Sequence, residues 1–339
     1  MRTEKIKTIR ELMQKALELR KITGEPAKLI IEDFLGAQME EKFTHGLGKF
    51  LLIDSALKER KGSPKIVKEG TNYALVNGNK ELGHIAAHFS INKLKEKAKN
   101  GIGTVGLYNS SRYGRLKIFG QMLSDSGLVG LIMNNAGPGA VTPFNGIDPI
   151  LGTNPICFSF PSFSNDFIFD FSTSKEVWGE IRQAMLEQRE LPSNSFLNKN
   201  GEFTLNPNDA DAVLPFDGPK GYAICLAIEL LAGALVGAEM GLNVKNQYDL
   251  GFLFIAIDAN IFTPLNLFKN KIKKLSNEIT SSRPQKSIEK VRLPGERSFL
   301  LQKQAERNGI VKVDSETFNR LKQMSESLGG GLQSNDKVD

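Results

Sequence analysis

Short apolar runs alternate with a helical segment in the middle of the chain, and this alternation limits the fold more than any other feature. The runs cover residues 73–79 (YALVNGN), 104–109 (TVGLYN) and 127–136 (GLVGLIMNNA), and residues 83–100 between the first two have the pattern of a helix. Further runs of strand character are ICFSF, FIFDF and FLFIAID, at 156–160, 167–171 and 252–258. Strands that alternate with helices predict an α/β domain built on a central sheet.

Helical patterns occupy both ends of the chain. Apolar residues recur at a period near 3.6 from Ile9 to Leu19, and Pro26 opens a second helical segment. The same spacing returns from Leu265 to Ile279. We therefore expect an N-terminal helical part (1–66), a central α/β domain (67–262) and a C-terminal helical part (263–339) that packs with the N-terminal one.

The composition is that of a folded globular protein. At roughly 150 residues per domain, 339 residues suggest about two domains. A hydrophobic content of 40% and a charged content of 24% exclude disordered and low-complexity classes. The net charge of +6 is small for this length, and the basic residues between Phe268 and Arg297 fall between the apolar positions of a predicted helix. We interpret them as its solvated face and expect no nucleic-acid partner.

Neither secretion nor membrane insertion is indicated. The N-terminus, MRTEKIKTIRELMQ, lacks the apolar core of a signal peptide. The longest apolar stretch, residues 221–240, contains two glutamates and lacks the roughly 20 uninterrupted apolar residues of a membrane span. We expect a buried helix there, no membrane partner and a cytoplasmic protein. Cys157 and Cys225 lie in apolar surroundings, so both are expected to be free and buried.

Gly101, Gly103 and Gly106 spell the G-x-G-x-x-G motif of dinucleotide-binding folds. That motif must follow a strand and open a helix, so that the pyrophosphate meets the helix N-terminus. Here the predicted helix comes first and the strand second. The first glycines are better explained as the end of the helix, and we do not predict a Rossmann site.

The three histidines offer two kinds of chemistry. His84 and His88 stand four residues apart on a predicted helix, a spacing that suits a metal, but no third ligand lies nearby in the sequence. We interpret them as a surface or half-buried pair and predict no metal. His45 lies in a small polar loop with Lys49 four residues on. Together they could protonate a carbonyl oxygen and hold a carboxylate, although a lone histidine is usually structural.

Two segments could bind an anion. Residues 170–174 (DFSTS) follow a strand and offer hydroxyl and backbone N–H groups, and Lys220-Gly221 begins the long apolar helix. Each is also explained by ordinary helix capping, so neither is decisive alone.

Read together, these pieces resemble the type 2 malate/L-lactate dehydrogenase family. The matching segments are THGLGKF (44–50), NGIGTVGLYNSSRYG (100–114), LGTNPICFSFP (151–161), DFSTS (170–174), PFDGPKGYAICLAIELLAGALVGAEMG (215–241) and LPGERS (293–298). LGTNPI and the helix that begins with PKGY are the most specific of them.

The resemblance implies a non-Rossmann, sulfolactate-dehydrogenase-like α/β fold, with a central mixed sheet domain and a helical domain built from both chain ends. It implies NAD- or NADP-dependent interconversion of a small 2-oxo acid, or cyclic imine acid, and its 2-hydroxy or amino acid, by a homodimer. His45 would be the proton donor, with Thr44, Lys49 and Arg112 around the substrate. The implied cofactor-binding residues are Asn154, Asp170, Phe171, Ser172, Thr173, Ser174, Lys220, Gly221, Gly295, Glu296 and Arg297.

Three positions depart from the family's usual pattern. Lys49 replaces an arginine of the Ser-His-Gly-x-x-Arg motif, and an ammonium cannot hold a carboxylate in two-point fashion as a guanidinium does. Arg112 replaces a histidine and cannot shuttle protons near neutral pH. Asn198 replaces an aspartate. Two hypotheses stay open: a shifted substrate, with Arg112 binding the carboxylate, or a catalytically weakened member that binds the nicotinamide cofactor in a non-catalytic role.

Overall fold

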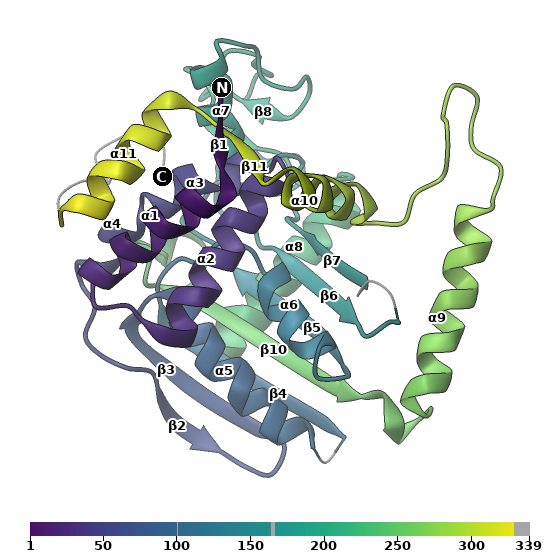
Figure 1. Ribbon diagram of the computed structural model, residues 1–339. Helices are drawn as coiled ribbons and strands as arrows, with labels where there is room; N and C mark the ends of the chain where they lie inside the picture. Colours follow the sequence, from purple (N-terminus) through teal and green to yellow (C-terminus); the bar gives the residue numbers. More distant parts are fainter. Residues whose placement is uncertain (100, 164–166, 329–339) are drawn as a thin grey trace.

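A seven-stranded mixed sheet forms the centre of the protein (Figure 1). The computed structural model describes residues 1–99, 101–163 and 167–328. The strand order is β2 (Lys65–Glu69), β3 (Tyr73–Glu81), β4 (Ile102–Ser110), β10 (Leu250–Asp258), β5 (Leu128–Asn135), β6 (Ile156–Phe160) and β7 (Phe167–Phe171). Only the β3–β4 pair is parallel among these neighbours. The predicted α/β class with a central mixed sheet is confirmed.

Helices cover both faces of this sheet, and the central strand β10 shows why. Phe252, Phe254 and Ala256 pack into one core with α5 (Gly83–Ala98) and α6 (Lys117–Ser124). Leu253 packs into a second core with α8 (Pro219–Ala232). Because successive side chains of a strand point to opposite faces, α8 lies on the face opposite to α5 and α6. A strand covered on both faces reads as one continuous apolar run, as β10 does.

The two chain ends build one helical layer at the edge of the sheet domain. The N-terminal elements are β1 (Arg2–Lys5), α1 (Ile6–Leu19), α2 (Gly24–Met39), η1 (Phe43–His45), α3 (Leu47–Phe50) and α4 (Ile53–Leu57). The C-terminal ones are α10 (Glu296–Asn308), β11 (Ile310–Val313) and α11 (Ser315–Glu326). β1 pairs antiparallel with β11, and Val313, Leu321 and Met324 share a buried core with α1 and α2. The boundaries at residues 66 and 262 stay predictions.

Helix α9 (Leu265–Thr280) differs from the expectation that the whole C-terminal part packs on the N-terminal helices. It follows η4 (Ala259–Ile261) and stands away from the body of the molecule, joined to α10 by a long loop (Figure 1). None of its residues is buried, although it carries the predicted apolar stripe.

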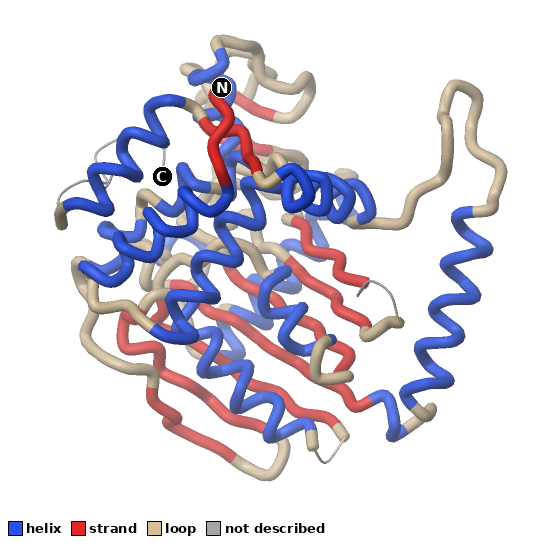
Figure 2. Tube along the Cα trace, in the orientation of Figure 1, coloured by secondary structure: helices blue, strands red, loops and turns tan. Residues whose placement is uncertain are grey.

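In the tube view, helices surround the strands of the central sheet (Figure 2). The remaining elements are α7 (Gly179–Glu187), β8 (Phe196–Leu197), β9 (Ala212–Val213), η2 (Ala234–Val236) and η3 (Gly241–Asn243). The apolar helix α8 ends at Ala232, with Gly233 as its C-cap residue, rather than at residue 240. By length and composition alone, Pro219–Val236 could cross a membrane, but a core helix passes the same test. The expected buried helix is buried on one face only: Ile228 and Ala232 pack on the sheet, whereas Leu230 is 51% exposed. Both cysteines are free and buried, as predicted.

Candidate active site

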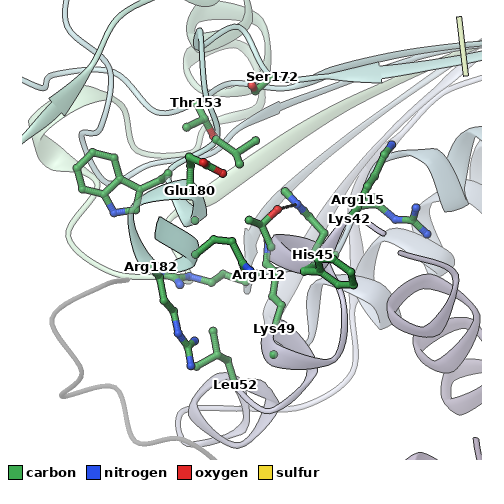
Figure 3. Close-up of a pocket in the computed structure, with 18 of the residues that line it drawn as sticks. Lys42, His45, Lys49, Leu52, Arg112, Arg115, Thr153, Ser172, Glu180 and Arg182 are labelled. Atoms are coloured by element: carbon green, nitrogen blue, oxygen red, sulfur yellow. Dashed lines mark hydrogen bonds between the residues drawn. The ribbon is translucent and has the colours of Figure 1, made fainter. Parts of the chain in front are cut away.

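A cavity of about 1180 Å³ opens between the helical layer and the sheet domain. One wall comes from η1 and α3, a second from the loop after β4, and a third from the end of β7 and the start of α7. His45, Lys49, Arg112 and Ser172 all line it (Figure 3). A volume of this size exceeds what one small acid needs and has room for a larger second ligand.

The loop that carries His45 is fixed to α2 by Gln38. The Gln38 side-chain oxygen accepts a hydrogen bond from the Leu47 backbone N–H at 2.9 Å. A β-carbon at Gly46 would lie 2.2 Å from that oxygen, so a larger residue here would push the Gln38 amide away and break this bond. The Thr44 hydroxyl and His45 Nδ1 are hydrogen-bonded at 3.0 Å, which leaves Nε2 as the ring atom available for proton transfer.

Cations dominate the surroundings of His45. Burial lowers the pKa of His45 well below its usual range, and the charges of Lys49, Arg115 and Lys42 lower it further, while Asp33 opposes them. His45 is therefore neutral near pH 7 when only protein groups surround it. An anion bound among these cations would favour the protonated imidazole.

Arg115, one of these cations, belongs to a buried ion-pair network. Asp33 on α2 is fully buried and accepts hydrogen bonds from the Arg115 backbone N–H at 3.0 Å and from Arg115 Nε at 2.9 Å. His84 Nε2 lies 2.9 Å from the same carboxylate. Gly114 is essential to this packing, because a β-carbon there would come within 1.8 Å of Asp33 Oδ2. The network fixes the Arg112–Arg115 loop against α2.

Glu40 extends the network toward β7. Its carboxylate contacts Arg115 Nη1 at 3.0 Å and Lys117 Nζ at 2.7 Å. Burial raises the pKa of Glu40, but Arg115, Lys117 and Lys42 outweigh it and bring the pKa to about 2. The Lys117 backbone N–H donates to Asp170 at 2.8 Å. The helical layer and the cofactor segment predicted at residues 170–174 are thus connected by charged contacts.

Sequence reasoning missed this network. Asp33 interrupts the apolar stretch of α2, and a carboxylate inside such a stretch is a usable signal for a buried partner. No comparable signal marks Arg115 as the partner of Asp33 or Lys117 as the partner of Glu40, because these partners lie 82 and 77 positions further along the chain.

The structure brings only part of the predicted site together. The cavity lining includes Thr44, His45, Lys49, Arg112, Asp170, Phe171 and Ser172. Asn154 and Thr173 lie behind it, fully buried: Asn154 donates to Glu229 at 2.6 Å, and Thr173 donates to the Asn154 carbonyl at 3.0 Å. The lining does not include Ser174, Lys220, Gly221, Gly295, Glu296 or Arg297. Their cofactor role stays a prediction.

Three residues singled out in the sequence have structural roles in the described chain. His84 is buried rather than half-exposed, because it pairs with Asp33. Gly101 follows α5 with a φ of +111°, and its N–H bonds the Ala98 carbonyl, in keeping with a helix end. Asn198 lies outside the cavity lining and closes its own turn through bonds to Glu202.

The family model for malate/L-lactate dehydrogenase matches residues 5–322. The chain belongs to this family. The malate/(S)-sulfolactate dehydrogenase of Methanothermus fervidus is 34% identical over 332 residues, covering 94% of this chain and 96% of the relative. The ureidoglycolate dehydrogenase (NAD(+)) of Escherichia coli K12 is 27% identical and covers 91% of each chain.

Solved structures agree with this family and its fold. The sulfolactate dehydrogenase of Methanocaldococcus jannaschii superposes with a TM-score of 0.86 at 31% identity and covers 97% of this chain and 98% of its own. The malate dehydrogenase of Entamoeba histolytica shares the fold, with a TM-score of 0.89 at 23% identity over 96% of this chain and 98% of its own. Membership in this dehydrogenase family makes the protein an oxidoreductase, and the sulfolactate-dehydrogenase-like fold is confirmed.

Proposed function

We propose that the protein interconverts a small 2-oxo acid, or a cyclic imine acid, and its 2-hydroxy or amino acid with NAD or NADP. The observation that carries this proposal is the position of His45, half-buried in the cavity with Lys49 and Arg112 in the same lining. A proton donor beside cations suits a substrate that has a carboxylate next to a polarised C=O or C=N bond.

In this proposal the substrate carboxylate lies against Lys49 and Arg112, and the Thr44 hydroxyl orients the His45 ring. The carboxylate offsets the surrounding cations, so that the bound state favours protonated His45. His45 Nε2 then donates its proton to the developing oxyanion. Arg112, held by the Asp33–Arg115 network, supplies the two-point carboxylate contact that a lysine cannot make.

The cavity suits a nicotinamide cofactor beside such a substrate. Ser172 lines it just after β7, and its hydroxyl could bond a polar ring substituent or a phosphate. The Ser174 hydroxyl behind the lining lies 3.0 Å from the Ser172 hydroxyl and orients it. Bound there, the nicotinamide would supply the hydride and the protein its orientation.

Titration of the purified protein with NADH and NADPH, followed by nicotinamide fluorescence, tests the proposal. The bound form is then mixed with a panel of 2-oxo acids and cyclic imine acids. Binding followed by oxidation supports a working reductase and selects the cofactor. Binding with no oxidation across the panel favours the alternative, a weakened family member with a non-catalytic role. Absence of binding contradicts both.

We further propose that the protein is a cytoplasmic homodimer. Two apolar faces lack a partner within the described chain. One is the outer face of α8 and the following η2, where Leu230 is 51% and Leu235 67% exposed, and the other is the stripe of α9, where Leu275 is 55% exposed. Helix α9 stands away from the rest of its subunit, so its apolar stripe can pack on a second copy of the chain. In a two-fold symmetric dimer each subunit contributes the same surfaces, so the apolar faces of both copies become buried.

Mass measurement in solution tests the dimer. The wild type is expected at twice the chain mass of 37.4 kDa, and Leu230→Glu or Leu275→Glu should shift it toward the monomer. Val67→Glu, at a residue 51% exposed on β2, is the matched control and should stay dimeric. A monomeric wild type would contradict the proposal.

A further inference from the structure

Arg182 is a cation of the cavity that neither the sequence motifs nor the proposed chemistry uses. It lies on α7, is half-buried, and lines the same cavity as His45. Within the described residues it has no hydrogen bond and no ion pair. A half-buried guanidinium gives up part of its hydration, and here no protein group compensates for the loss, so its place in the cavity points to an anionic ligand.

The neighbouring Arg189, in contrast, forms ion pairs with acidic residues of α7. Arg189 lines the cavity as well, but its guanidinium contacts Glu180 and Glu187, each at 2.6 Å. Both acids of α7 are thereby used, and Arg182 is left facing the cavity. The contrast separates a cation that stabilises the helix end from one that is available to a ligand.

The position of Arg182 suggests which part of a ligand it meets. In the view of Figure 3, Ser172 and Thr153 lie at one side, Lys49, Arg112 and His45 lie in the middle, and the Arg182 side chain extends toward Leu52 on the far side. In the proposed function, the cofactor approaches from the Ser172 side and the substrate carboxylate lies in the middle. A group at Arg182 would then be the end of the substrate furthest from the cofactor.

We propose that Arg182 is a specificity-determining residue that binds a second anionic group, a carboxylate or sulfonate, on the tail of the substrate. The inference rests on the proposed function for the orientation of the substrate. A guanidinium can hold either group through two parallel hydrogen bonds, whereas an uncharged tail would leave Arg182 unpaired. The preferred substrate is thus an acid with charges at both ends.

Trp178 provides a direct readout. It is the single tryptophan of the chain, is the N-cap residue of α7, and lines the same cavity as Arg182, four residues further on. Tryptophan fluorescence is followed during titration with L-malate and with L-lactate. The two share the 2-hydroxy acid end and differ in the second carboxylate. This measurement needs no turnover.

We expect L-malate to bind the wild type at least tenfold more tightly than L-lactate. Arg182→Gln should weaken the binding of L-malate about tenfold and change the binding of L-lactate by less than twofold. The affinity of Arg182→Lys for L-malate should lie between those of the wild type and Arg182→Gln. Arg189→Gln, which removes an equal charge from the same wall, is the matched control and should keep the preference for L-malate. Thermal unfolding of each variant checks that it is folded.

Several results would overturn the proposal. They are no preference in the wild type, no fluorescence change with either acid, a preference that survives in Arg182→Gln, or an equal loss in Arg189→Gln. Selective weakening of NADPH binding in Arg182→Gln would assign the residue to a cofactor phosphate instead. If the wild type prefers L-malate but turns over no acid with either cofactor, the proposed catalytic function fails while the assignment of Arg182 stands.

Discussion

Asp33→Asn is expected to be among the most destabilising polar substitutions in this protein. The change keeps the shape of the side chain and removes its charge. Asp33 is fully buried and accepts two hydrogen bonds from Arg115, and His84 Nε2 lies 2.9 Å away. With an asparagine in its place, the 7% exposed Arg115 loses its closest counter-charge and retains only Glu40 at 3.0 Å.

Removing one partner of a buried ion pair typically costs about 3–5 kcal/mol. Because Glu40 still neutralises part of the Arg115 charge, we expect the lower end, about 3 kcal/mol. Glu306→Gln is the matched control, since it breaks an exposed pair with Lys303 at 3.2 Å. Exposed pairs contribute about 0–1 kcal/mol. The two substitutions should therefore differ by at least about 2 kcal/mol in the free energy of unfolding.

The effect of Asp33→Asn should also depend on pH. Burial raises the pKa of Asp33, but Arg115 and His84 outweigh it and hold the pKa well below its usual range. A carboxyl whose pKa is lowered by folding stabilises the protein fully above its unfolded pKa of about 3.9, and this stabilisation is lost as the pH falls toward the folded value. The wild type should therefore lose its advantage over Asp33→Asn progressively below about pH 4.

Urea unfolding at one fixed protein concentration, followed at pH 7 and at pH 3, measures both expectations. A fixed concentration is needed because self-association changes apparent stability. A loss at pH 7 no larger than that of Glu306→Gln would refute the role given to the network. So would a difference from wild type that is unchanged at pH 3.

Three further predictions concern the cavity and its support. His45→Ala should lower kcat for an identified oxo acid by about 10²–10⁴-fold while cofactor fluorescence is retained, and near-full activity would exclude His45 as proton donor. Because the pKa of His45 is lowered in the free protein, kcat/KM for reduction should rise as the pH falls below 6.5. Lys49→Met removes a charge that lowers this pKa, so it should move the rise to higher pH. A pH-independent profile would contradict this. Gly114→Ala should lower the melting temperature through the 1.8 Å clash with Asp33, whereas Gly48→Ala, with nothing within 4 Å of the added carbon, should not.

Much of the sheet could be predicted from the sequence because each of its inner strands is an apolar run of consecutive residues. Six apolar runs between residues 73 and 258 became β3, β4, β5, β6, β7 and β10. β2 and β11 were not predicted. Lys65–Glu69 and Ile310–Val313 are short edge strands that carry exposed lysines, so their apolar pattern is weak. β1, charged at three of its four positions, is a strand only because β11 pairs with it.

The sequence by itself determined the class of fold, the family and the loop that carries His45, since periodicity and motifs are properties of neighbouring residues. Only the tertiary structure decided what surrounds that histidine. Asp33 meets Arg115 across 82 positions, and Arg182 reaches the cavity because α7 packs against η1. Charge pairing depends on distance in space and leaves no pattern in the order of residues. Only the folded structure therefore shows which cations are paired and which are available to a ligand.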